Sequence, residues 1–351
     1  MVSALIVLEE LRSIQETQGA IVDNDNIVVT FNNDEVAYES ARSGVALHDQ
    51  SHWNRIEVSD QHRLDFLHNQ STNGFKLLKP GETCDTTFLT STARTIDLAT
   101  ALILENTVQL LVSPGMAPKL IAFLDRFIFF SDRVTLTDIT ATTTTFSLIG
   151  PTSATALKSI GILAPESGYI NAEIGNTPVQ IIAGSGLGIP GYRLVMAAEN
   201  AAIVWKTLSE IATVLGDRPY QRLRIEQGRP MPDFELTDDY NPLDAGLWNT
   251  ISFNKGCYIG QETIARLDTY NGVKLNLWGM KLSSSVPLGS VIYSDDTKVG
   301  TITSIYEFEN GSAIAIGYIR VKAGGAGQVV TVESQTTMLE DLAFQSRLKV
   351  V

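Results

Sequence analysis

The chain changes character at Leu275, and this change constrains the fold more than any other feature of the sequence. From there on, short β-rich runs alternate with glycine-rich turns, and no run has the spacing of a helix. Strands are expected at 278–282, 291–293, 301–306, 313–319 and 329–332. Regular short strands with Gly-rich turns are typical of a small barrel or sandwich. The sequence therefore predicts a C-terminal β-domain over 273–351, with other domains upstream.

Upstream of residue 273, the patterns of helices and strands are mixed. Leu5, Leu8 and Leu11 predict an amphipathic first helix, and further helices are expected at 63–69, 116–130, 153–160 and 201–215. Strands are expected at 27–31, 45–47, 86–89, 100–104 and 108–112. The Thr-rich segment 134–148 is expected to be a strand too, because β-branched residues favour strands. Mixed helices and mainly antiparallel strands indicate the α+β class.

Length and charge limit the kinds of partner. The chain has 351 residues, and at about 150 residues per domain this suggests two or three domains. The formal net charge of −13 argues against a protein that coats nucleic acid or an anionic membrane surface, since both depend on clustered Lys and Arg. No stretch reaches about 18 uncharged apolar residues, so no membrane span is expected. Direct nucleic-acid binding is therefore not expected.

Cysteine and histidine usage points to a reducing compartment and predicts no metal site. Only Cys84 and Cys257 are present, too few for a secreted disulfide scaffold. The apolar run at 4–8 is too short for a signal peptide. We therefore expect a cytoplasmic protein, or one in an equivalent reducing organelle compartment. His48 and His52 are four residues apart, but the sequence around them reads as a strand entering a turn, which favours surface or capping roles over metal binding.

The densest chemistry lies in the segment 253–266. Gly256 and Gly260 bracket Cys257, and a helix is expected to begin near Gln261. A glycine-rich turn that enters a helix exposes backbone N–H groups and the positive end of the helix dipole. These groups, together with the charge of Lys255, would favour the thiolate and make Cys257 reactive. The alternative is that Cys257 is a small buried apolar residue.

The octapeptide 255–262, Lys-Gly-Cys-Tyr-Ile-Gly-Gln-Glu, resembles the signature of the YgfZ family. That family consists of folate-binding proteins related to the T-protein (aminomethyltransferase, GcvT) of the glycine cleavage system. Further segments resemble the family in the expected order, at 44–52, 66–73, 221–228, 298–304 and 313–318. The resemblance implies a three-domain GcvT/YgfZ-like cloverleaf around a central channel for tetrahydrofolate. Its domains would be 1–50 with 140–272, then 51–139, and the C-terminal small β-barrel 273–351.

The resemblance also implies roles for two carboxylates. Glu226 stands where T-proteins place a carboxylate that binds the pterin, a sensible use because a carboxylate can accept two N–H bonds. Alternatively, Glu226 pairs with Arg222 or Arg224. Asp97 matches one member of the T-protein's catalytic Asp-Asp pair, so it is expected to be catalytic or to contact the folate. The second carboxylate is replaced by Leu98, a departure that weakens the expectation of aminomethyl transfer.

Three further residues would contact the folate if the resemblance holds, namely Lys255, Tyr258 and Arg266. T-proteins have a Phe-Ile-Gly-like stretch where this chain has Tyr258-Ile259-Gly260, but generally lack the preceding cysteine. Arg266 could bind the anionic tail of the folate, or could pair with Glu262 at the i, i+4 spacing.

Three functions follow as hypotheses from the resemblance. The leading one is a tetrahydrofolate-binding protein of the YgfZ type that supports iron–sulfur cluster assembly or repair, and indirectly tRNA modification, through Cys257. Its partners would be iron–sulfur enzymes or assembly proteins. The first alternative is a folate-dependent aminomethyltransferase or demethylase of the T-protein type. The second is a non-catalytic folate-responsive adaptor. In each case the ligand is tetrahydrofolate or a one-carbon derivative, and whether the protein is an enzyme stays open.

Overall fold

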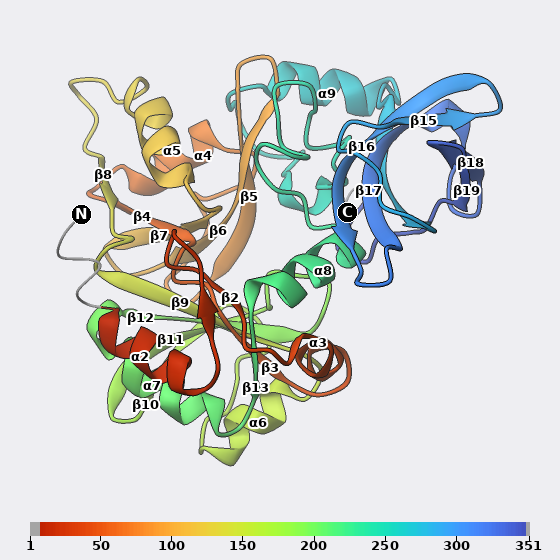
Figure 1. Cartoon of the computed structure of the whole chain (residues 1–351). Helices are drawn as coiled ribbons and strands as arrows, with labels where there is room; N and C mark the ends of the chain where they lie inside the picture. Colours follow the sequence, from red (N-terminus) through yellow and green to blue (C-terminus); the bar gives the residue numbers. More distant parts are fainter. Residues whose placement is uncertain (1–7, 349–351) are drawn as a thin grey trace. The chain divides into compact units, whose positions relative to one another are not determined.

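Several β-sheets and the helices beside them build a mixed α/β structure (Figure 1). The computed structural model describes residues 8–348. The chain divides into two compact units, each made of separate stretches. Unit 1 contains Met1–Phe66, Phe75–Cys84 and Ala99–Tyr220, and unit 2 contains Leu67–Gly74, Asp85–Leu98 and Gln221–Val351. Each unit therefore draws on distant parts of the sequence.

Unit 1 is built on a six-stranded sheet with the order β10-β11-β12-β9-β3-β13. The strands are β3 (Ala46–Asp49), β9 (Thr143–Ile149), β10 (Tyr169–Ile174), β11 (Thr177–Ala183), β12 (Gly191–Ala197) and β13 (Thr213–Leu215). All pairings are antiparallel except that of β13 with β3. Helices α2 (Glu9–Thr17) and α7 (Ala201–Ser209) lie side by side and pack against this sheet, where Leu11, Trp205 and Phe146 share one apolar core (Figure 1).

Unit 1 also contains elements outside this sheet. They are the ribbon β1 (Ile21–Val22) with β2 (Val28–Thr30), and the helices α3 (Asp34–Ser43) and α6 (Ser153–Ser159). A second sheet has the order β5-β6-β7-β4-β8. Its strands are β4 (Asn54–Ser59), β5 (Thr83–Leu89), β6 (Thr95–Ile103), β7 (Thr107–Val112) and β8 (Thr135–Asp138), accompanied by α4 (Arg63–Gln70) and α5 (Met116–Asp125). Strands β5 and β6 continue from one unit into the other along the chain, as do α4 and α8 (Asp217–Gln227).

Unit 2 contains the C-terminal β-structure that the sequence predicts. Its sheet has the order β14-β17-β16-β15-β18-β19. The strands are β14 (Leu275–Leu282), β15 (Val291–Ser294), β16 (Thr297–Glu307), β17 (Ala313–Arg320), β18 (Val329–Val332) and β19 (Gln335–Met338). Gly279 and Glu340 exchange backbone hydrogen bonds of 3.0 and 2.8 Å, so the segment after β19 returns to β14. The sheet therefore curls around its own apolar core, which includes Trp278, Ile302 and Val332.

Three expectations for individual elements need correction. The helix expected at 201–215 ends at Ser209, because 213–215 pairs as β13 with β3 instead. The helix expected at 116–130 ends at Asp125, before a Phe-Ile-Phe-Phe run of poor helix formers. The Thr-rich segment forms two strands, β8 and β9, with a turn between them. The first helix, α2, begins at Glu9, and Leu5 lies outside the described residues.

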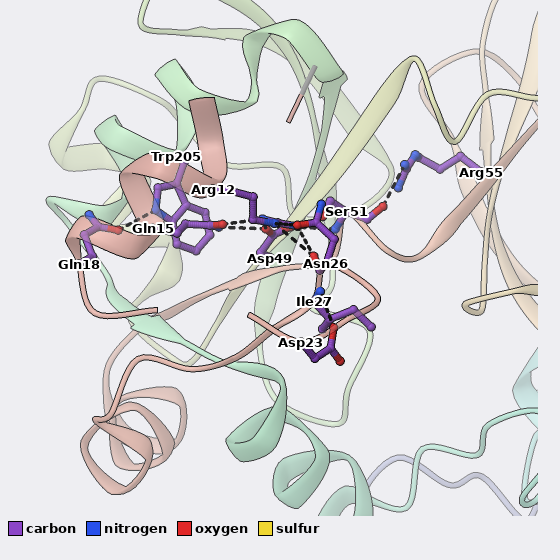
Figure 2. Close-up of polar contacts among 10 residues, drawn as sticks. All are labelled: Arg12, Gln15, Gln18, Asp23, Asn26, Ile27, Asp49, Ser51, Arg55 and Trp205. Carbon is purple, nitrogen blue, oxygen red and sulfur yellow. Dashed lines mark hydrogen bonds and ion pairs between the residues drawn. The ribbon is translucent and has the colours of Figure 1, made fainter. Parts of the chain in front are cut away.

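A buried ion pair joins the first helix of unit 1 to its central sheet. Figure 2 shows Arg12 of α2 reaching Asp49 at the end of β3, with 2.5 Å between Nη1 and Oδ2. Gln15 donates to the same carboxylate oxygen at 2.9 Å. Burial alone would raise the pKa of Asp49, but the Arg12 charge and the hydrogen bonds from Gln15 and Ser51 lower it to about 2. Asp49 therefore stays ionised and holds α2 in place.

A second buried guanidinium organises the turns beside β4. Arg55 is only 1% exposed and donates to the carbonyl oxygens of Trp53 (2.7 Å), Thr140 (2.8 Å) and Thr143 (2.9 Å). Burial lowers the pKa of Arg55 to about 10, so it remains a cation at neutral pH. Buried carbonyls need donors, and here one side chain supplies several of them.

We predict that Arg55→Met lowers the free energy of unfolding by about 3 kcal/mol or more, because several buried carbonyls lose their donor at once. Urea unfolding followed by circular dichroism measures the change. Arg42→Met is the matched control, since Arg42 is exposed and its contact with Glu39 spans 3.6 Å. The control is expected to shift stability by less than about 0.5 kcal/mol. Equal effects of the two variants would contradict the role assigned to Arg55.

Candidate functional site

The turn that carries Cys257 is fixed at its C-terminal end by Gly260. Gly260 has φ +82° and precedes helix α9 (Gln261–Thr269), so the helix begins where the sequence predicts. A Cβ at position 260 would lie 2.9 Å from the carbonyl oxygen of Thr90 and 3.1 Å from the Cα of Ala93. Only glycine allows this approach together with a positive φ. The turn therefore packs directly against the connection between β5 and β6.

Lys255 fixes the other end of the same turn. Its Nζ donates to the carbonyl oxygens of His68 (2.5 Å), Ser71 (2.6 Å) and Asn73 (2.7 Å), and lies 4.5 Å from the centroid of the Tyr258 ring. These carbonyls lie at and just beyond the end of α4, where unpaired acceptors and the helix dipole favour a cation. Lys255 thus ties the turn to α4, a structural role that sequence reasoning missed.

Cys257 is exposed between these two attachments. The alternative that it is a small buried apolar residue is therefore wrong. Cys84, in β5, is partly exposed, and both cysteines are free thiols. Tyr258, next to the thiol, packs in a cluster that includes Ala93, Ile251 and Ile264. Burial raises the pKa of the Tyr258 hydroxyl. The turn thus presents an exposed thiol, that of Cys257, between two anchored ends.

Asp97 is fully buried on β6. Its Oδ1 accepts a hydrogen bond of 2.8 Å from the backbone N–H of Leu98. The strand here is joined to a loop of unit 2, because Thr95 N donates to the carbonyl of Tyr240 at 3.1 Å. Leu98 packs in one apolar cluster with Ile225 and Tyr240. The residues that flank Asp97 and Glu226 therefore share one core.

Glu226 lies on α8 and pairs with Arg222, with 3.4 Å between Oε1 and Nε. The Arg222 guanidinium also lies 4.8 Å from the centroid of the Phe308 ring. Arg224 instead pairs with Glu235, with 3.3 Å between Nη1 and Oε2, and both side chains are buried. Of the two alternative partners expected for Glu226, the structure thus shows Arg222.

Arg266 makes the short-range pair that the sequence allows. Its Nη2 lies 2.6 Å from Oε1 of Glu262, one turn earlier on α9, and both side chains are largely exposed. An exposed pair of this kind contributes little to stability and is readily exchanged for another partner.

Asp244 is a buried carboxylate that sequence reasoning missed. It is 4% exposed, and burial, the largest effect, raises its pKa to about 6 despite hydrogen bonds from Asn241 and the charge of Arg94. The neighbouring Tyr240 stacks on Tyr318 with 3.7 Å between ring centroids. A carboxyl group with a pKa near neutrality can hold or release a proton at physiological pH. Its local sequence gives no sign of this burial.

His48 is buried, so the surface or capping role expected for it is wrong. It is 1% exposed, and its ring stacks on Tyr220 at 4.2 Å between centroids. Burial, followed by the nearby His52, lowers the pKa of His48 to about 3. Within residues 8–348, no group of three or more His, Cys, Asp and Glu side chains is arranged to hold a metal ion.

Comparison with known proteins places these features in a family. The model of the GCVT N-terminal domain matches residues 26–255. At1g60990, a chloroplastic candidate transferase of Arabidopsis thaliana, is 43% identical over 336 residues, which cover 94% of this chain and 78% of the relative. An aminomethyltransferase of Halalkalibacterium halodurans is 26% identical over 301 residues, 82% of each chain.

One solved structure shares the fold over nearly the whole chain. It is the glycine cleavage system aminomethyltransferase T from Bartonella henselae, with a TM-score of 0.83 at 20% identity, covering 97% of this chain and 98% of that one. At this identity the likeness concerns the fold alone. Among the helices of residues 8–348, none has both the length and the apolar character needed to cross a membrane.

We predict that, below pH 6.5, the free energy of unfolding of His48→Phe depends less on pH than that of the wild type. Unfolding lets His48 take up a proton below pH 6.5, whereas the folded state resists protonation down to about pH 3. Its contribution is therefore complete above pH 6.5 and is lost as the pH falls through this window, by up to about 1.4 kcal/mol per pH unit. Urea midpoints measured across this range for both proteins give the difference. Parallel profiles would show that His48 is not buried as a neutral ring.

We predict that Lys255→Met destabilises the protein by about 1–3 kcal/mol, because three carbonyls lose a charged donor. Urea unfolding followed by circular dichroism measures the loss. Lys255→Arg, which retains the charge and some donors, should recover part of the stability. An unchanged free energy of unfolding in Lys255→Met would contradict the role assigned to Lys255.

Proposed function

The chain belongs to the family of the GCVT N-terminal domain, and on that premise we propose that it binds tetrahydrofolate and transfers a one-carbon unit to or from it. The match spans more than half of the chain, and a relative in this family is named as an aminomethyltransferase. We further propose the three-domain cloverleaf around a central folate channel, with domains 1–50 plus 140–272, 51–139 and a barrel 273–351. Bound tetrahydrofolate supplies the nitrogen atoms that carry the one-carbon unit.

The hydrogen-bond acceptors of unit 2 are of the kind that a folate needs. A pterin ring presents N–H groups, and carboxylates accept them in charge-assisted hydrogen bonds. Glu226 can be reached by such a ligand because its side chain is one-quarter exposed. We assign Glu226 to the pterin, Asp97 to the reacting part of the folate, and Tyr258 to its aromatic surface. We assign Lys255 to the support of the Cys257 turn beside the folate, and Arg266 to the anionic tail in exchange for Glu262.

Asp97 carries the proposed reaction. It is a fully buried carboxylate, and its ionised form would act strongly on positive charge that develops nearby, because water does not screen it. Asp244, with a pKa of about 6, could hold the proton that the transfer moves. The observation that supports this proposal most is the shared core of Leu98, Ile225 and Tyr240, since it joins the segments of Asp97, Glu226 and Asp244.

The exposed thiol favours a second candidate function. T-proteins generally lack a cysteine at the position of Cys257. In this chain Cys257 is exposed on a turn that Lys255 and Gly260 hold in place. This supports a YgfZ-type role in iron–sulfur cluster assembly or repair, with iron–sulfur enzymes or assembly proteins as partners and tRNA modification as an indirect outcome. If the protein has neither activity, we propose that it is a non-catalytic folate-responsive adaptor. In each case we propose a reducing compartment, either the cytoplasm or an organelle like that of the chloroplastic relative.

We predict that Glu226→Gln weakens tetrahydrofolate binding at least about tenfold in isothermal titration, because a charge-assisted bond to the pterin is lost. Glu340→Gln, at the exposed Lys281–Glu340 pair of unit 2, is the matched control and should bind as the wild type does. Asp97→Asn should abolish turnover of an aminomethyl or N-methyl donor while folate still binds. Unchanged affinity in Glu226→Gln would remove the pterin assignment.

The two functions separate in Cys257→Ala. This variant should bind tetrahydrofolate normally, since the sulfur is not assigned to the folate. If the protein is a transferase, turnover persists in Cys257→Ala. If it supports iron–sulfur enzymes, the variant fails to restore their activity in a complementation assay and the wild type succeeds.

A further inference from the structure

Unit 1 contains a cleft that the proposed folate site does not use. Its volume is about 420 Å³, within the range of small-ligand sites. Separate segments line it: the start of α2, the β1–β2 turn, the residues after β3, and the β8–β9 turn. Its polar lining consists of Arg12, Asp25, Asn26, Ser51, His52 and Asp138, with Thr140 beside them.

The basic side chains at the cleft offer no free positive charge to a ligand. Arg12 donates from Nε to Asn26, from Nη1 to Gln15 and Asp49, and from Nη2 to Asn26 and Ser51 (Figure 2). All parts of this guanidinium therefore have acceptors, and none points a spare donor into the cleft. Burial, the largest effect, lowers the pKa of His52, so this ring is neutral at physiological pH. An anion would find no uncommitted positive partner here.

The carboxylates that line the cleft have fewer hydrogen-bond partners than Arg12 has. Within residues 8–348, the Asp25 carboxylate has no hydrogen-bond or ion-pair partner, although its backbone N–H donates to Asp23 at 3.0 Å. One oxygen of Asp138 accepts from Thr140 N at 2.9 Å, which leaves the other oxygen as an acceptor. Of the charged groups that line the cleft, Asp25 and Asp138 are carboxylates, and Arg12 is a guanidinium that already pairs with Asp49. The surplus charge of this lining is negative.

The cleft also has an apolar wall. Leu8 and Ala141 line it alongside the carboxylates. A ligand that satisfies both features has a cationic N–H donor at one end and a short hydrocarbon stem at the other. We propose that this cleft binds a small primary or secondary ammonium compound with a short aliphatic stem. Its ammonium group contacts Asp25 and Asp138, and its stem packs against Leu8 and Ala141.

The test uses n-butylammonium as the probe, with 1-butanol and butyrate as neutral and anionic molecules of the same length. Isothermal titration at low ionic strength should show saturable binding of one n-butylammonium per chain, and at least about tenfold weaker binding of the other two. Asp25→Asn with Asp138→Asn should weaken n-butylammonium binding at least about tenfold. Asparagine keeps the hydrogen bond to Thr140 N, so the turn should still fold.

Two controls separate a site from general attraction to an acidic protein. Asp295→Asn with Asp296→Asn removes the same charge from an exposed turn of unit 2 and should leave binding unchanged. Ala141→Trp fills the cleft without changing its charge and should abolish binding. The proposal is overturned if no saturable binding occurs, if 1-butanol binds as well, or if the Asp295/Asp296 control weakens binding equally. None of these results bears on folate binding, whose residues lie in unit 2.

Discussion

Long cationic side chains that donate to backbone carbonyls hold the irregular parts of this chain in place. Only 19% of the residues are charged, yet Arg55 in unit 1 and Lys255 in unit 2 each donate to several carbonyls, which lie in turns or near the ends of a helix or strand. A buried carbonyl without a donor is costly, so turns of this kind need such a side chain or ordered water. Arg224 does the same for Arg229 O while it pairs with Glu235. The geometry of the loops therefore depends on a few long side chains.

The geometry of the candidate site depends on one of these cations, Lys255, together with Gly260. Lys255 anchors one end of the Cys257 turn to α4, and Gly260 brings the other end against Thr90 and Ala93. A thiol on an unsupported loop would sample many positions. Here the backbone on both sides of the sulfur is fixed, so an exposed cysteine keeps a defined position. The same contacts bring the β5–β6 connection close to the turn, which places Tyr258 in the cluster with Ala93.

Local pattern predicted the elements whose structure depends on neighbours in sequence. The C-terminal strands and the start of α9 follow from alternation, turn residues and Gly260. The pattern did not predict the features that depend on contacts between distant segments of the chain. The segment 213–215 continues the apolar spacing of α7, yet it pairs in parallel with β3, more than 160 residues away. Lys255 meets carbonyls up to 187 positions distant, and the burial of His48 and Asp244 is likewise tertiary. No local signal encodes such contacts, whereas the motif around Cys257 could be recognised directly.

The replacement of a second aspartate by Leu98 divides the chemistry of the proposed transfer between two segments. Two adjacent carboxylates repel each other, and the pair then tends to hold a proton. Leu98 removes that repulsion and packs with Ile225 and Tyr240, so Asp97 stands as a single carboxylate. The ability to hold a proton near neutral pH resides instead in Asp244, four residues after Tyr240. Thr95 joins the Asp97 strand to that loop through Tyr240 O. In the proposed transfer, Asp97 would therefore stabilise charge and Asp244 would carry the proton.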